Sequence, residues 1–216
     1  MAKKVLLNHN TPSVQYLCSK DKRLARVIQM VGPIRYTTHE ENPFAFLVHE
    51  IIEQMLSVKA AAKIYSRFVT ICDGSITPKS VSGLSFEQIK ATGTSSKKAK
   101  CIIELSKNIL SGALDLGQLE DKSDSDVMNI LVSQPGIGPW TAKMYLIFVL
   151  DRSDILPFED AAFLQSYHWI YKTNDYSVSA IKQRCKKWKP FSSVAARYLY
   201  RALDTGLTKS EFHLYK

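Results

Sequence analysis

The chain has 216 residues, of which 45% are hydrophobic and 23% charged, and this balance excludes an intrinsically disordered protein. Its net charge of +9 and isoelectric point of about 9.3 favour a polyanionic partner such as nucleic acid, although a basic surface that only maintains solubility is the competing interpretation. No segment approaches the roughly 20 apolar residues of a membrane span, and residues 1–8 lack the apolar core of a secretory signal. We therefore expect an intracellular protein without a membrane partner, in the cytoplasm or nucleoid, or in the nucleus of a eukaryote.

The cysteines lie far apart in the sequence, which excludes a local zinc knuckle or a clustered iron–sulfur ligand set. Scattered cysteines in a chain of this size favour buried thiols in a reducing compartment over distant disulfides. They are Cys18, Cys72, Cys101 and Cys185. We expect no metal centre and no cofactor.

The hydrophobic pattern is helical over nearly the whole chain. A first helix spans Asp21 to Met30 and ends at Gly32-Pro33, and short β stretches near Tyr36 stay open. Asn42 as N-cap and Pro43 begin a second helix, whose apolar residues recur at the spacing of one helical face. That stripe comprises Phe44, Leu47, Val48, Ile51, Ile52 and Met55.

Helix-capping residues and apolar periodicity predict the helices that follow. Ser57 caps one helix, Ser85 and Gln88 form a capping box for another, and Ser95 or Ser96 precedes a third. The remaining helices are expected at 124–131, from 138–139 to about 150, just beyond 160, at 177–187 and at 192–203. The sequence therefore predicts an all-α fold.

A tight turn, Pro135-Gly-Ile-Gly138, separates two of these helices. Gly136 and Gly138 can adopt positive φ and allow another backbone to approach closely, while Ile137 can point inward and fix the turn. Amides at the start of the following helix, together with the helix dipole, suit an anion such as a DNA phosphate. A plain helix–helix connector with glycine caps is the alternative.

The longer string Pro135-Gly-Ile-Gly-Pro-Trp-Thr-Ala142 resembles the helix-hairpin-helix of the DNA glycosylase superfamily, and its Trp-Thr-Ala ending is similar to the 3-methyladenine DNA glycosylase II group. The resemblance extends roughly from 21 to 203 and includes the segments 46–61 and 188–195. Gln134 departs from it, because the family usually has an aliphatic residue there, and we expect looser packing under the hairpin.

This resemblance implies a two-lobed helical fold with an interdomain cleft. Residues 42–155 are expected to form one lobe, with the helix-hairpin-helix at about 127–150. Residues 1–41 and 156–216 are expected to form the second lobe.

The resemblance also assigns a carboxylate. In the string Leu156-Pro-Phe-Glu-Asp-Ala-Ala162, Asp160 takes the place of the superfamily's aspartate. Cleavage of an N-glycosidic bond builds positive charge on the deoxyribose, which a fixed carboxylate stabilises while it orients or deprotonates water. An alkylated base is already cationic and leaves neutral, so the second carboxyl of glycoside hydrolases is not needed. The alternatives are that Asp160 only caps the next helix, and that Glu159 is the functional carboxylate.

Superfamily members that also cut the strand carry a nucleophilic lysine at the position of Trp140. Tryptophan there implies that water attacks and that an abasic site is the product. The resemblance places Trp140 in the base pocket, where an indole attracts a cationic base by about 0.5–2 kcal/mol, although a core role is the common alternative. Tyr200 matches a second pocket aromatic, and Met144 stands where the group often has tyrosine, which leaves the substrate range open.

DNA contacts are expected from three segments. The hairpin contributes Gly136, Ile137, Gly138 and Thr141, and Gly93-Thr94-Ser95 forms a second backbone-contact loop. Met55 or Leu56 is the wedge that fills the gap left by the flipped base, unless both only close a helix interface. Some lysines and arginines of two basic clusters should contact phosphates; these are Lys97, Lys98 and Lys100, and Lys182, Arg184, Lys186, Lys187 and Lys189.

Together these features predict a monomeric, monofunctional DNA glycosylase of base excision repair. Its expected partner is double-stranded DNA that contains alkylated bases, with 3-methyladenine and 7-methylguanine as the substrates. A monovalent cation at the hairpin stays open. The alternatives are a non-catalytic helix-hairpin-helix DNA-binding protein and a glycosylase for other damaged bases, although the latter predicts an iron–sulfur cluster or a lysine at position 140.

Overall fold

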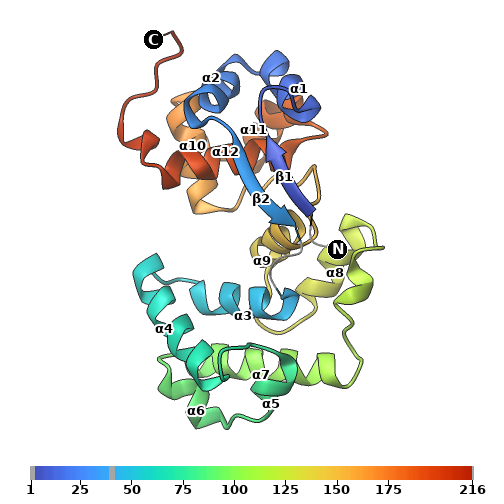
Figure 1. Ribbon diagram of the computed structural model, residues 1–216. Helices are drawn as coiled ribbons and strands as arrows, with labels where there is room; N and C mark the ends of the chain where they lie inside the picture. The colour runs from blue at the N-terminus through green and yellow to red at the C-terminus, as the bar shows by residue number, and fades with distance from the viewer. Residues whose placement is uncertain (1–2, 39–41, 216) are drawn as a thin grey trace. The chain divides into compact units, whose positions relative to one another are not determined.

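The computed structural model describes residues 3–38 and 42–215 and is mostly helical (Figure 1). The chain divides into two compact units: the hairpin unit, His39–Leu150, and the terminal unit, which combines Met1–Thr38 with Asp151–Lys216. The expected all-α class is confirmed, with one small two-stranded sheet in addition. Within the two described ranges, no helix is long and apolar enough to cross a membrane.

Local capping explains most helix starts in the hairpin unit. The Asn42 side chain accepts hydrogen bonds from the amides of Phe44 and Ala45, and Ser85 with Gln88 forms the expected capping box. The helices are α3 Pro43–Glu53, α4 Val58–Ile71, α5 Pro78–Ser82, α6 Phe86–Ala91, α7 Ser96–Leu110, α8 Asp124–Val132 and α9 Pro139–Met144. A 3-10 turn, Gly117–Leu119, lies between α7 and α8, and a π-helix, Tyr145–Val149, follows α9.

The apolar stripe of α3 is buried along its length except at its final predicted member. Helix α3 packs against α4, α7, α9 and the π-helix. Phe44, Leu47 and Ile51 are among the buried side chains, whereas Met55 is 101% exposed. The helix ends at Glu53, so the backbone has already left the helical spiral before Met55.

The terminal unit is a bundle of helices around one hydrophobic cluster, and both the N-terminal and the C-terminal part of the chain contribute residues to this cluster. Helix α12 packs against α10 and α2, and α1 packs against α2. The cluster includes Leu17, Leu24, Phe163, Tyr167, Trp188 and Tyr198. The elements are β1 Lys3–Leu7, α1 Pro12–Lys20, α2 Lys22–Val31, β2 Ile34–Thr38, α10 Ala161–Tyr171, α11 Val178–Cys185 and α12 Ser192–Asp204, with short 3-10 turns at Lys186–Trp188 and Leu207–Lys209.

Two features of the terminal unit were not predicted as such. Strands β1 and β2 pair antiparallel, from Lys3 opposite Thr38 to Leu7 opposite Ile34, so the β structure left open near Tyr36 is real. Helix α1 was missed because its apolar face is narrow, with Val14 and Leu17 as its buried residues.

The four cysteines are free thiols, as predicted. Cys72, Cys101 and Cys185 are buried, and Cys18 is partly buried. Burial raises the pKa of the Cys185 thiol, which makes that group an inert member of the core.

A buried carboxylate, Asp21, ties three segments of the terminal unit together. Its Oδ1 atom caps α2 by accepting from the amides of Arg23 and Leu24. Its Oδ2 atom accepts from the Tyr171 hydroxyl, from the Trp188 indole at 2.9 Å and from the Lys187 ammonium at 3.0 Å. Burial raises the pKa of Asp21, but these three donors outweigh it, and the pKa lies below the usual value of 3.8.

We expect Asp21→Asn to lower the free energy of unfolding by about 2–3 kcal/mol at pH 7, because the amide that replaces Oδ2 or Oδ1 leaves buried donors unmatched. Because the folded-state pKa is depressed, the stabilisation is present above about pH 4 and is lost as the pH falls through the folded-state pKa. The difference between the two proteins should therefore shrink in acid. Urea denaturation at several pH values measures both effects.

Asp204→Asn, at the exposed end of α12, is the matched control and should change stability by less than about 0.5 kcal/mol. An Asp21→Asn protein as stable as the wild type at pH 7 would contradict the structural role of this carboxylate.

Candidate functional site

The hairpin lies between the end of α8 at Val132 and the start of α9 at Pro139. Gly136 has a φ of +81°, and the Ile137 amide donates to the Gln134 carbonyl at 3.2 Å, which closes the turn. Ile137 is buried, as expected from its place between the glycines. Gly138 is the N-cap residue of α9 and has no side chain that could cap it. The turn therefore presents backbone, rather than side chains, at the helix start.

Helix α7 packs directly against the hairpin turn. A β-carbon placed on Gly136 would lie 2.8 Å from both Cβ and Sγ of Cys101, so the turn approaches α7 as closely as a glycine allows. The Asn108 side chain, also on α7, donates to the Gln134 side-chain oxygen at 2.9 Å. The looser packing expected at Gln134 is thus offset by a polar contact that an aliphatic residue could not make.

A second turn, Glu53–Leu56, follows α3 and presents Met55. The Leu56 amide donates to the Glu53 carbonyl at 3.0 Å, Gln54 has φ −44° and ψ 126°, and Met55 has φ +58°. These angles are those of a type II turn with methionine where glycine is usual. The left-handed conformation costs about 1–2 kcal/mol for a residue with a side chain. The contacts that hold this turn therefore matter.

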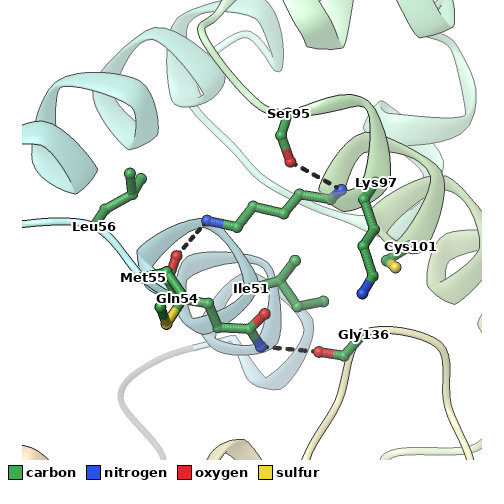
Figure 2. A pocket seen from close by; sticks show the side chains of 9 residues that line it. Ile51, Gln54, Met55, Leu56, Ser95, Lys97, Cys101 and Gly136 are labelled. Atoms are coloured by element: carbon green, nitrogen blue, oxygen red, sulfur yellow. Dashed lines mark hydrogen bonds between the residues drawn. The ribbon is translucent and has the colours of Figure 1, made fainter.

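Two side chains hold the Met55 turn. The Gln54 amide donates to the Gly136 carbonyl at 2.9 Å and to the Thr141 hydroxyl at 3.3 Å. The Lys98 ammonium donates to the carbonyls of Ile52 at 2.9 Å and Gln54 at 2.5 Å. Burial lowers the pKa of Lys98. Figure 2 shows the Gln54 amide directed at the Gly136 carbonyl, so the turn and the hairpin are in direct contact.

A pocket of about 350 Å³ lies where these segments meet (Figure 2). It brings together several residues singled out in the sequence, and Leu56 also borders a smaller pocket of about 60 Å³ beside Gly93, Thr94 and Ser95. The larger pocket is lined by Ile51, Gln54, Met55, Leu56, Ser95, Lys97, Lys98, Cys101 and Gly136.

The segment Gly93-Thr94-Ser95 leads into α7. Gly93 has a φ of +102°, and Thr94 is buried, with its hydroxyl 2.8 Å from that of Thr92. The Ser95 side chain accepts from the Lys98 amide at 3.4 Å and is the N-cap of α7, which decides between the two serines considered as caps.

Asp160 is the N-cap residue of α10. Its Oδ1 atom accepts from the Phe163 amide at 2.7 Å, and the residue is only 8% exposed. Asp160 therefore caps α10, as the alternative interpretation of its sequence position expected, and the carboxylate is held in one orientation. Glu159, one residue earlier, is exposed. Tyr200 lies on α12, which packs against α10, and its partly buried ring contacts the core cluster of the terminal unit.

Trp140 and Met144 are four residues apart on α9 and therefore lie on the same face of that helix. Trp140 is half-buried and Met144 is buried. The π-helix that begins at Tyr145 carries no signal in the sequence. The buried Tyr145 hydroxyl has no hydrogen-bond partner in the part of the chain that the structure describes, and burial raises its pKa.

Part of the second basic cluster has a structural role that its sequence pattern did not reveal. Lys187 pairs with Asp21, Lys189 lies 3.6 Å from Asp154, and Arg184 donates to the Tyr167 hydroxyl at 3.0 Å. These three cations have partners within the terminal unit. In the first cluster, the Lys98 ammonium already donates to the carbonyls of Ile52 and Gln54, so phosphate contacts should come from the remaining lysines of the two clusters.

One group of side chains on α3 has the spacing of metal ligands. Ligand atoms of His49, Glu50 and Glu53 lie within 4.8 Å of one another. Acidic clusters of this kind are common without an ion, and no step of the chemistry considered below uses it.

DNA glycosylases are among the known proteins to which the chain is similar. DNA-3-methyladenine glycosylase 1 of Schizosaccharomyces pombe is 25% identical over 205 residues, which cover 92% of this chain and 90% of that protein. The crystal structure of a DNA-3-methyladenine glycosidase from Bacillus halodurans is 30% identical and superposes with a TM-score of 0.83, covering 97% of each chain.

A structure that contains DNA is also similar. The 3-methyladenine DNA glycosylase of Schizosaccharomyces pombe in complex with abasic DNA is 25% identical, with a TM-score of 0.78 over 95% of this chain and 100% of that one. The model of the HhH-GPD superfamily of base excision DNA repair proteins matches residues 48–191. The chain therefore belongs to the HhH-GPD superfamily of base excision DNA repair glycosylases, as the hairpin motif predicted.

Proposed function

We propose that this protein is a monofunctional DNA glycosylase that hydrolyses the N-glycosidic bond of alkylated bases, 3-methyladenine and 7-methylguanine, and leaves an abasic site. The observation that carries the proposal is Asp160, a carboxylate that is nearly buried and held by the start of α10. The names of the two 3-methyladenine glycosylases to which the chain is similar support the substrate class.

Asp160 stabilises the oxocarbenium-like sugar and orients the attacking water. A carboxylate that is fixed before the reaction loses no free energy to reorientation when the charge develops. The cap bond to the Phe163 amide uses Oδ1 and fixes the orientation of the carboxylate. Capping and catalysis are thus compatible functions of one side chain.

Trp140 stands where a strand-cutting enzyme needs a lysine, so the nucleophile is water. Its indole face attracts the cationic alkylated base by about 0.5–2 kcal/mol. Met144 lies on the same face of α9 as Trp140, and Tyr200 of the terminal unit is the second aromatic residue that we propose for base recognition. The flexible thioether of Met144 adapts to bases of different shape, which favours a broad substrate range.

The hairpin and the loop Gly93-Thr94-Ser95 hold the DNA backbone. The backbone of Gly136, Ile137 and Gly138 lies at the start of α9, where the helix dipole attracts a phosphate, whereas the Thr141 hydroxyl is buried and accepts from the Gln54 amide. Met55 is the wedge, because it is 101% exposed and held at the tip of a turn, whereas Leu56 is 39% exposed and borders two pockets. Met55 would fill the gap left by the flipped base.

A non-catalytic DNA-binding protein with the same fold is the second candidate. The two candidates differ in whether bases are released.

Incubation with methylated DNA and chromatography of the released bases tests the proposal. We expect release of 3-methyladenine and 7-methylguanine, and a loss of about 10²–10⁴-fold in the single-turnover rate for Asp160→Asn. Asparagine caps helices as well as aspartate does, so this variant should fold normally. The matched control, Glu159→Gln, should retain the wild-type rate.

Binding of methylated DNA without release of either base above the spontaneous rate would favour the non-catalytic candidate. Equal rates for Asp160→Asn and the wild type would remove Asp160 from the mechanism while leaving the activity established.

Borohydride trapping tests the role assigned to water. Because position 140 carries tryptophan, we expect no covalent protein–DNA adduct and an abasic strand that breaks only on treatment with hot alkali. A bifunctional glycosylase with a lysine nucleophile serves as the positive control. Trapping of this protein at a comparable yield would show that an amine attacks the sugar.

A further inference from the structure

We propose that Gln54 is a positioning residue that fixes the Met55 turn, residues 53–56, to the hairpin, so that phosphate binding and insertion of Met55 occur on one rigid support. This inference rests on the proposed function, in which Met55 is the wedge and the hairpin holds a phosphate. Gln54 is not assigned to contact the DNA itself.

The first argument is the geometry of the Gln54 side chain. One amide nitrogen, Nε2, donates to the Gly136 carbonyl at 2.9 Å and to the Thr141 hydroxyl at 3.3 Å. The Gly136 carbonyl lies in the hairpin, before the N-cap residue Gly138, and the Thr141 hydroxyl lies after it, in the first helical turn of α9. A residue 82 positions earlier in the chain thereby makes contact with both ends of the proposed phosphate site.

The second argument is the position of Gln54 in its own turn. Gln54 directly precedes Met55, whose φ of +58° is unfavourable for a residue with a side chain. Met55 is fully exposed, so its own side chain contributes little packing that could hold this conformation. The turn must be held by its neighbours, and Gln54 is the neighbour whose side chain reaches the hairpin.

Lys98 holds the same turn from the opposite side. Its ammonium donates to the carbonyls of Ile52 and Gln54, at the C-terminal end of α3, where a cation also complements the helix dipole. The Gln54 residue is therefore fixed at both its side chain and its carbonyl. Met55 is left as the group that projects from a constrained support.

A rigid support reduces what insertion costs in conformational freedom. A wedge that moved independently of the phosphate site would have to be ordered at the moment of base flipping. With Gln54 in place, binding of the backbone at the hairpin already sets the position of Met55 relative to the gap. Loss of Gln54 should therefore reduce insertion and leave the phosphate contacts in place.

A duplex that contains a stable abasic analogue, with 2-aminopurine beside it, reports insertion without requiring catalysis. We expect Gln54→Leu to reduce the 2-aminopurine fluorescence rise on binding and to slow single-turnover base release by about tenfold. The salt dependence of DNA affinity should stay unchanged, because the phosphate contacts are retained. Gln54→Glu, which has the same size and cannot donate when ionised, should behave like Gln54→Leu.

The matched control is Gln134→Leu, which also removes a glutamine that connects the hairpin to its surroundings but does not contact the Met55 turn. It should leave the fluorescence rise within about twofold of the wild type, on the scale of context effects on such contacts. Thermal unfolding of each variant identifies any that fails to fold, and Gln54→Glu then replaces Gln54→Leu.

A double-mutant cycle with Met55→Ala distinguishes positioning from general structural damage. In the Met55→Ala background, Gln54→Leu should have no further effect on fluorescence or rate, because the group that it positions is absent. Equal effects of Gln54→Leu in both backgrounds, or no effect in either, would overturn the inference. Normal fluorescence behaviour without base release would instead contradict the proposed function and leave this inference standing.

Discussion

The approach of the hairpin to α7 is the constraint on which the proposed DNA-binding surface depends. Gly136 combines a positive φ with a contact that leaves no room for a β-carbon beside Cys101. Because the hairpin lies this close to α7, the Gly136 carbonyl is within hydrogen-bonding distance of the Gln54 side chain, which holds the Met55 turn against the hairpin. The Lys98 ammonium, one helical turn before Cys101 on the same helix, holds the other side of that turn. A single helix thus supports two of the three segments that we expect to contact DNA, the hairpin and the Met55 turn.

Two buried aspartates of the terminal unit have different proposed roles. Both Asp21 and Asp160 cap helices through Oδ1. Asp21 also receives three side-chain donors on Oδ2, which lower its pKa and use its charge to join α2, α10 and the segment after α11. Its charge is matched within the fold, so we regard it as structural. Asp160 follows an exposed glutamate at the start of α10, and its charge is the one that we assign to chemistry.

Features encoded within a few neighbouring residues were predictable from the sequence. The caps at Asn42, Ser57, Ser85 and Asp160 and the glycine turn of the hairpin follow from local rules of helix ends. Helix α1 was missed because its apolar face is narrow, but several other missed features depend on residues distant in sequence. Strand β1 pairs with β2, and the Gln134 side chain accepts from Asn108. Lys187 was included in a predicted phosphate-binding cluster because its partner, Asp21, lies 166 positions away in the sequence. The apolar stripe predicted for α3 also included Met55, because the spacing of apolar residues does not indicate where the helix ends.

The most direct test of this account is the affinity of two glycine variants for an abasic duplex, measured beside their free energies of unfolding. A β-carbon on Gly138 would meet no atom within 4 Å, and the φ of −95° at this residue suits alanine. Gly138→Ala should therefore be as stable as the wild type. It should bind DNA at least tenfold more weakly, because the added methyl group keeps the phosphate at a distance. Gly136→Ala should lose about 2–4 kcal/mol of stability, through its left-handed φ and its collision with Cys101, and bind DNA weakly as well. Wild-type affinity for DNA in both variants would contradict the account.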